Sequence, residues 1–257
     1  PLSPPVIADG RVYVAEIDTH RVCALDAETG DMLWDFTAGG RVDSLPTILG
    51  DTVLFGSKDG RLYCLRAKDG ELAWSLRAVP KRRLVFSYGQ LESSWPLHGN
   101  ILVHDGVAYF TAGRSSFLDD GIHVFGVDPT SGDVLHHHVI NSRDEKGRQP
   151  KGIVDRFGLK QGALTDVMSA EGENIFMRHK RFSEKLEELP EDKPHLYAPA
   201  GFLNEYWWHR TYWQYGTQMG TGYHGWHNAG NESPAGRILA RRGDTFYGFG
   251  RMNYDKR

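Results

Sequence analysis

The side chains best suited to ligand binding gather between residues 206 and 228, where Trp and Tyr alternate with His and Arg. Alternate residues of a β-strand point to the same face, so Trp207, His209 and Trp213 would share one face, opposite Arg210. Aromatic rings stack on flat ligands such as sugars, and neighbouring His or Arg side chains supply polar contacts. The candidate residues for such a site are His209, Arg210, Trp213, Tyr223, His224, Trp226 and His227.

The same aromatic residues have a second interpretation, in which they fill the core of a degenerate structural unit. Most of the Trp side chains fit this interpretation, because aromatic rings dominate the packing of protein cores. The interleaved His and Arg side chains fit it less well, since polar groups are costly to bury without partners. Both interpretations therefore stay open for this stretch.

Two loop-like stretches, 88–96 and 113–120, combine charged, hydroxyl and aromatic side chains. Ordinary turn and capping chemistry accounts for many such residues. If the loops converge at one end of the fold, however, their side chains would line a ligand site there. The candidates in these loops are Glu92, Ser94, Trp95, Arg114 and Asp119.

Metal and nucleophile chemistry has little support. His136 and His138 would share one face of a strand, an arrangement that can bind a metal ion. Because His136 stands where related segments carry Trp, we predict a structural role and no metal site. Cys23 and Cys64 are expected to be buried and reduced. The motifs G-x-S-x-G, H-E-x-x-H and the P-loop are missing from the sequence, so no catalytic residue is assigned.

The charge balance excludes some partners. The 257 residues include 30 Lys and Arg against 33 Asp and Glu, which gives a net charge of −3. Such a chain lacks the basic footprint that nucleic acids or anionic membranes require. Its apolar runs also fall short of the roughly 20 residues that a membrane helix needs. We therefore predict neither a nucleic-acid partner nor a membrane span.

The elements that must position these residues come from an internal repeat. The segment Ala24–Trp34 aligns with Cys64–Trp74 at a spacing of 40 residues, and a third copy runs from Gly126 to His136. Strand-like sequence with alternating apolar residues precedes each copy. A repeat of roughly 40 residues matches one propeller blade of four short strands.

Each copy also encodes a turn and an inter-sheet contact. Its D-x-x-T-G or K-D-G segment supplies the positive φ that a tight turn requires. The Trp four residues after the Gly then stands on the next strand, where it can pack between adjacent sheets. Helical patterns are nearly absent, and Phe182–Leu189 is better explained as a turn in a loop.

We predict a single all-β segment over residues 1–257. Its repeats lie at about 5–46, 47–80 and 100–140, with a degenerate repeat at 168–200 and an incomplete one at 235–257. Insertions interrupt the period at 80–100, 141–168 and 179–235. At this repeat length the chain holds about four to five four-stranded blades, so a partial ring is expected.

Several stretches resemble the PQQ-like β-propeller repeat superfamily, which includes quinoprotein alcohol dehydrogenases and a lipoprotein of the bacterial outer-membrane assembly complex. The chain is most similar to the large repeat proteins of this type in Planctomycetes, whose function is unassigned. The stretches that carry the resemblance are 40–46, 54–66, 89–96, 109–116, 207–213 and 234–239.

The resemblance implies a β-propeller of seven or eight blades in the whole protein. A quinoprotein dehydrogenase of this group needs PQQ, a Ca²⁺ ion and, in many members, a disulfide between adjacent cysteines. Cys23 and Cys64 are not adjacent. We therefore predict no cofactor, with PQQ and Ca²⁺ as the alternative.

The leading functional hypothesis is an extracytoplasmic, periplasmic or extracellular scaffold that binds a ligand or another protein. Its partners would be other segments of the same protein, a separate protein or a carbohydrate. The alternative is an enzyme, either a quinoprotein-type oxidoreductase or a polysaccharide lyase or hydrolase acting in the central channel.

Overall fold

The computed structural model describes residues 1–87, 89–148, 154–155, 158–159, 162–198, 201, 213–217 and 233–249. The chain divides into two compact units, Pro1–Asn141 and Ser142–Arg257, and each is described by itself. Regular structure in the described residues is all β, as the sequence predicts. These residues contain no helix long and apolar enough to cross a membrane.

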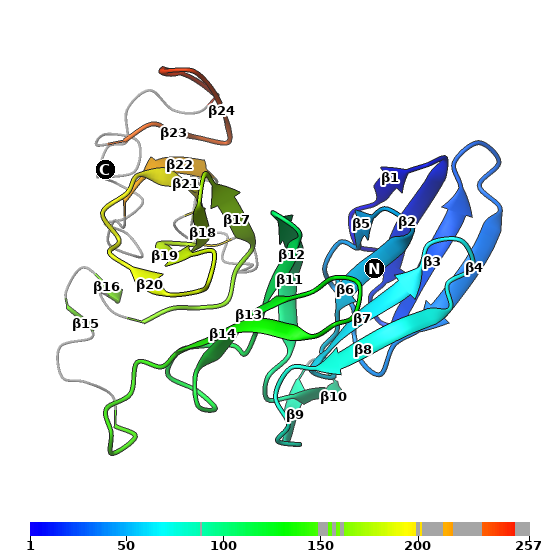
Figure 1. The fold of residues 1–257 in the computed structure, drawn as a ribbon, viewed down its shortest axis with the longest axis horizontal. Coiled ribbons are helices and arrows are strands. Elements are labelled where there is room, and N and C mark those ends of the chain that lie inside the picture. The colour runs from blue at the N-terminus through cyan, green and yellow to red at the C-terminus, as the bar shows by residue number, and fades with distance from the viewer. Residues whose placement is uncertain are drawn as a thin grey trace. The chain divides into compact units, whose positions relative to one another are not determined.

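The described residues of the first unit form three four-stranded antiparallel sheets, each with its strands in chain order (Figure 1). The first sheet comprises β1 (Val6–Ala8), β2 (Arg11–Glu16), β3 (Arg21–Asp26) and β4 (Met32–Thr37). The second comprises β5 (Thr47–Leu49), β6 (Thr52–Gly56), β7 (Arg61–Arg66) and β8 (Leu72–Arg77). The third comprises β11 (Leu97–His104), β12 (Val107–Ala112), β13 (Ile122–Val127) and β14 (Val134–Ile140). These sheets are the propeller-type blades that the repeat predicts.

The middle sheet is buried on both faces, and its alternating sequence divides it between two cores. Tyr63 and Leu65 of β7 pack with the first sheet, whereas Leu62 and Cys64 pack with the third. Neighbouring side chains along a strand point to opposite faces, which produces this division. A shift of β7 by one residue would exchange the two sets, so burial on both sides determines the register.

The repeated Trp and Gly residues meet between successive sheets. Trp34 of the first sheet lies over the turn that contains Gly70 of the second, and its indole N–H donates to the Ala67 carbonyl at 2.9 Å. Trp74 of the second sheet lies in the same way over Gly132 of the third. A Cβ on Gly70 would stand 2.6 Å from the Trp34 ring. The predicted inter-sheet position of the Trp is confirmed, and the Gly is required by space as well as by φ.

The turn before each Trp follows from local hydrogen bonding. In the first copy, the carboxylate of Asp26 accepts the backbone N–H groups of Glu28 and Thr29, both at 2.9 Å. These bonds lower the pKa of Asp26. Gly30 closes the turn with a φ of 78°, which a residue with a Cβ rarely adopts. The D-x-x-T-G segment is therefore a turn motif.

The second unit is also built from antiparallel strands in its described residues. A short pair is β15 (Val154–Asp155) and β16 (Gly158–Leu159). A four-stranded sheet comprises β17 (Met168–Glu171), β18 (Asn174–Met177), β19 (Lys180–Ser183) and β20 (Glu188–Leu189). A three-stranded sheet comprises β21 (His195–Tyr197), β22 (Trp213–Gly216) and β23 (Ala235–Gly236), and a last pair is β24 (Ile238–Arg242) and β25 (Thr245–Phe249).

Residues 180–189 lie where two expected ranges overlap, the degenerate repeat 168–200 and the insertion 179–235. They form β19, β20 and the turn between them, so the fourth sheet is complete. β19 carries a single apolar side chain, Phe182, which is fully buried. Such a short strand offers no alternating pattern by which the sequence could reveal it.

Candidate functional site

The five loop residues predicted from the sequence lie in the first unit, in the connections that follow β8 and β12. Asp119 joins three of them: its carboxylate pairs with Arg114 at 3.0 Å, and its carbonyl accepts the Trp95 indole N–H at 2.5 Å. Ser94 and Glu92 are buried nearby in the same chain segment as Trp95. The predicted residues therefore form internal contacts, and their role in binding a ligand stays a prediction.

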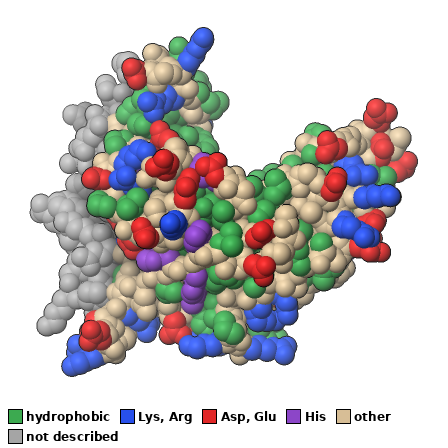
Figure 2. All heavy atoms as spheres, viewed as in Figure 1, with side chains coloured by type: hydrophobic (Ala, Val, Ile, Leu, Met, Phe, Trp, Pro, Cys, Tyr) green, Lys and Arg blue, Asp and Glu red, His purple; other side chains and the backbone are tan. Residues whose placement is uncertain are grey.

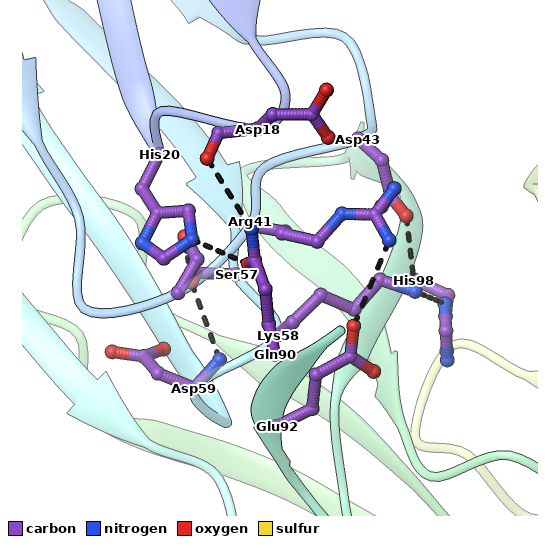
Figure 3. Close-up of polar contacts among 11 residues, drawn as sticks. Asp18, His20, Arg41, Asp43, Ser57, Lys58, Asp59, Gln90, Glu92 and His98 are labelled. Atoms are coloured by element: carbon purple, nitrogen blue, oxygen red, sulfur yellow. Dashed lines mark hydrogen bonds and ion pairs between the residues drawn. The ribbon is translucent and has the colours of Figure 1, made fainter. Parts of the chain in front are cut away.

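A second carboxylate–cation pair lies beside this group. The Nζ atom of Lys58, a residue only 5% exposed, is 3.0 Å from Asp43 and donates to Nδ1 of His98 at 2.7 Å (Figure 3). Burial and the Lys58 ammonium lower the pKa of His98 to about 3, so its imidazole is neutral at pH 7. A neutral ring with a lone pair on Nδ1 is the acceptor that Lys58 requires.

The third pair joins Arg41 to Glu92, whose carboxylate lies 3.9 Å from the guanidinium (Figure 3). Glu92 is 3% exposed, so its charge is buried together with that of its partner. We name these residues the charged cluster: Arg41, Asp43, Lys58, Glu92, His98, Arg114 and Asp119. Ion pairs that lose hydration on burial are by themselves weak evidence of stabilisation.

The charged cluster braces a hairpin that the sequence assigned only to an insertion. β9 (Leu84–Ser87) and β10 (Gln90–Ser93) pair antiparallel, with Phe86 opposite Leu91. On the inner face, Gln90 contacts His20 at 2.6 Å and donates to the Asp18 carbonyl (Figure 3). At its base, Arg83 pairs with Asp119 at 2.9 Å. Polar contacts therefore hold the hairpin against the rest of the first unit.

The outer face of the hairpin is apolar and exposed. Leu84, Phe86 and Leu91 are 48%, 75% and 63% exposed, and all three lie on the same side of the two-stranded sheet. On the face of the molecule that Figure 2 shows, acidic and basic side chains are interspersed with apolar ones. Contiguous exposed apolar side chains on a rigid element are typical of interaction surfaces.

Sequence reasoning missed Arg41, Lys58 and His98. Lys58 belongs to a K-D-G segment, which reads as an ordinary turn, and His98 lies at the start of a strand. The only sequence signal is that each is polar and lies beside a connection between strands. The contacts of Lys58 with His98 and of Arg41 with Glu92 join positions 40 or more residues apart, which spacing along one element cannot reveal.

The aromatic candidates of the second unit are only partly described. His209, Arg210, Tyr223, His224, Trp226 and His227 lie outside the described residues. Trp213 lies in β22, half-buried, and lines a cavity within this unit.

The His136–His138 segment lies on β14, where His136 is the register partner of Gly126. The close nitrogen contact involves a different residue, because Nε2 of His137 lies 3.0 Å from Nδ1 of His123 on the neighbouring strand. Burial and the nearby His137 lower the pKa of His123 to about 4. The contact is a hydrogen bond between two neutral rings, in which the N–H group of one ring donates to the lone pair of the other.

The comparisons with known proteins agree with the repeat architecture. A family model described as Outer membrane protein assembly factor BamB matches residues 2–180. The chain belongs to this PQQ-like repeat family. It is 32% identical over 122 residues to the dehydrogenase subunit of a quinone alcohol dehydrogenase from Gluconobacter oxydans, a match covering 42% of the chain and 16% of that protein. It is 43% identical over 73 residues to BamB from Alkalilimnicola ehrlichii, a match covering 28% of the chain and 18% of that protein.

Among solved structures, a quinohemoprotein alcohol dehydrogenase from Pseudomonas putida superposes with a TM-score of 0.51 at 14% identity, covering 74% of the chain and 34% of that structure. At this identity the likeness concerns the fold alone, which is an all-β propeller type. The matched regions span less than a fifth of both curated relatives of the PQQ-like repeat family.

The charged cluster does not fit the cofactor of the quinoprotein members. Ca²⁺ needs six to eight oxygen ligands, usually with several free carboxylates. Each carboxylate of the cluster is already paired with a cation: Asp43 with Lys58, Glu92 with Arg41, and Asp119 with Arg114. Cys23 and Cys64 are buried free thiols, as predicted, and burial raises the pKa of both. We derive no quinone chemistry from these residues.

Proposed function

We propose that this chain is part of an extracytoplasmic PQQ-like propeller that acts as a protein-interaction scaffold. The location and the scaffold role are supported by relatives named as outer membrane protein assembly factors. The observation that carries the proposal is the exposed apolar face of the hairpin β9–β10, formed by Leu84, Phe86 and Leu91.

The hairpin is suited to this role because its two faces have different surroundings. The inner face is held by Gln90 and, through Glu92, by Arg41, so the outer side chains are presented on a fixed element. Preorganised apolar side chains lose little conformational freedom on binding, which favours association. An aromatic anchor such as Phe86 is also the residue type that most often dominates an interface.

The partner that fits is a separate protein with an apolar groove. At the hairpin base, Lys81 pairs with Asp120, while Arg83 shares Asp119 with Arg114, so basic groups outnumber acidic ones there. The apolar face supplies the attraction, and charge contributes mainly to orientation.

Site-specific photocrosslinking tests this proposal in cells that make the full protein. A benzophenone side chain replaces Phe86 or Leu91, and a control replaces Leu33, an exposed apolar residue of β4 away from the hairpin. We expect crosslinks to a second polypeptide from positions 86 and 91, with loss of the position-86 crosslink in Leu91→Asp. Crosslinks confined to the same polypeptide, or equally strong from position 33, would contradict the proposal.

A carbohydrate ligand, the other partner expected from the sequence, is a separate proposal. It concerns the second unit, where Trp213 lies.

A further inference from the structure

The second unit contains a cavity of about 320 Å³ between strands of three sheets. Its size lies at the lower end of the range of small-molecule sites, about 300–1,000 Å³. Aromatic and aliphatic side chains form most of its wall, and one acidic and one basic side chain are among the few polar groups. The residues used below are Glu171, Phe176, Trp213, Tyr215, Arg241 and Phe246.

The aromatic wall is held in place by its own contacts. The ring of His195 stacks on Phe176 with centroids 4.0 Å apart, and both of its nitrogens face backbone carbonyl oxygens. On another part of the wall, Tyr215 and Phe246 pack with centroids 4.7 Å apart. Trp213 shares its face of β22 with Tyr215, because the two residues are two positions apart.

The polar groups of the cavity form a fixed pair. Nη1 of Arg241 donates to the Tyr215 hydroxyl at 2.8 Å and lies 3.4 Å from the carboxylate of Glu171. The guanidinium carbon lies 5.1 Å from the centroid of the Tyr215 ring and 5.7 Å from that of Phe246. Its Nη2 group takes part in none of these contacts, so it can donate to a ligand. Arg241 and Glu171 are each about two-fifths exposed, and a ligand can reach both.

We propose that this cavity binds a neutral sugar ring, with one face of the sugar packed on the aromatic wall and its hydroxyl groups bonded to Arg241 and Glu171. The proposal concerns the second unit and does not depend on the hairpin of the first.

The charges of the site favour this ligand over other small molecules. An anion would be attracted by Arg241 but repelled by Glu171, and a cation would meet the reverse situation. A purely apolar ligand would leave both charged groups desolvated without new partners. A hydroxyl both donates and accepts, so neighbouring hydroxyls of one ring can bond the carboxylate and the guanidinium together. The aromatic rings then cover the carbon-bound hydrogens of the sugar.

The experiment uses the whole chain and a panel of neutral trisaccharides: maltotriose, cellotriose, mannotriose and chitotriose. Binding is measured by saturation-transfer NMR and calorimetry. We expect at least one to bind saturably, and Trp213→Ala and Arg241→Met each to weaken it at least tenfold. Tyr215→Phe keeps the ring but removes the hydroxyl that holds Arg241, so we expect a loss of about threefold to fivefold.

Matched controls lie next to the site. Arg242 and Tyr247 adjoin Arg241 and Phe246 on the same two strands and do not line the cavity. Arg242→Met and Tyr247→Ala should change the affinity less than twofold. Circular dichroism shows whether each variant is folded. If Trp213→Ala does not fold, Tyr215→Phe still tests the site. The proposal is wrong if no trisaccharide saturates, if the site variants bind like the controls, or if benzoate binds there and the sugars do not.

Discussion

The two units use the same type of side chain in opposite ways. In the first unit, the Trp34 and Trp74 rings lie over glycine turns of the next sheet, so a neighbouring turn covers one face of each ring. In the second unit, Trp213 faces a cavity together with Tyr215 and Phe246. Aromatic content alone therefore says little about binding. What matters is whether a glycine turn of a neighbouring sheet covers the ring.

The largest effect that separates the two uses is expected from removing the rings. Trp34→Ala should lower the free energy of unfolding by about 3–5 kcal/mol, because it opens a cavity and removes the indole hydrogen bond to the Ala67 carbonyl. Trp213→Ala should cost only about 1 kcal/mol, since its ring is half-buried and lines a cavity already. Urea unfolding of both variants measures the difference. Equal losses would mean that Trp213 is a core residue.

The next effect concerns the glycine beneath the ring. Gly70 and Gly30 share the same backbone region, with φ values of 73° and 78°. Gly70→Ala places a methyl group against Trp34 and should cost about 3–4 kcal/mol. Gly30 has open space around its missing Cβ, so Gly30→Ala should cost about 1 kcal/mol from strain alone. Comparable losses of unfolding free energy for the two variants would show that backbone strain, and not the contact with Trp34, determines the cost of replacing Gly70.

A smaller effect tests the charged cluster through pH. His98 has a pKa of about 3 in the folded chain against about 6.5 when unfolded, so the unfolded chain binds more protons between these values. His98 alone should therefore lower stability by about 2–3 kcal/mol as pH drops from 6.5 to 4.5, and His123 acts in the same direction. His98→Asn keeps an acceptor for Lys58 and should reduce this slope. If stability depends on pH in the same way in His98→Asn as in the parent chain, His98 is not the source of this pH dependence.

The smallest effect is expected at the hairpin. Leu91 is largely exposed on the outer face of β10, so Leu91→Ser should change the free energy of unfolding by less than about 0.5 kcal/mol. Thermal melting beside the parent chain measures this. A loss above 1 kcal/mol would show that Leu91 belongs to the core, and the interaction proposal would lose its basis.

The sequence was most informative where one physical signal repeats. The 40-residue spacing of Trp34 and Trp74 predicted both the blades and the Trp position, because each copy carries its own turn and strand pattern. The charged cluster could not be predicted in this way. Lys58 meets His98 only because two different sheets bring their ends together, and neither residue has an unusual local pattern.

The candidate sites show the same limit. Arg114 and Asp119 are five positions apart in one loop, and the sequence identified both. Glu171 and Arg241 are 70 positions apart, and each looks like an ordinary surface residue of a short strand. Their meeting depends on the packing of separate sheets, which local composition does not encode.

The contact of Trp34 with Gly70 also limits which duplications can lengthen such a repeat protein during evolution. The first two repeats each supply an indole ring to the glycine turn of the next repeat, Trp34 to Gly70 and Trp74 to Gly132. A duplication that adds a whole period keeps every ring over a turn. A duplication that adds half a period would leave an indole ring without a glycine turn beneath it, or a glycine turn without a ring above it. Length changes in this lineage should therefore be tolerated in steps of one repeat, or as loop insertions that leave the Trp and Gly positions intact.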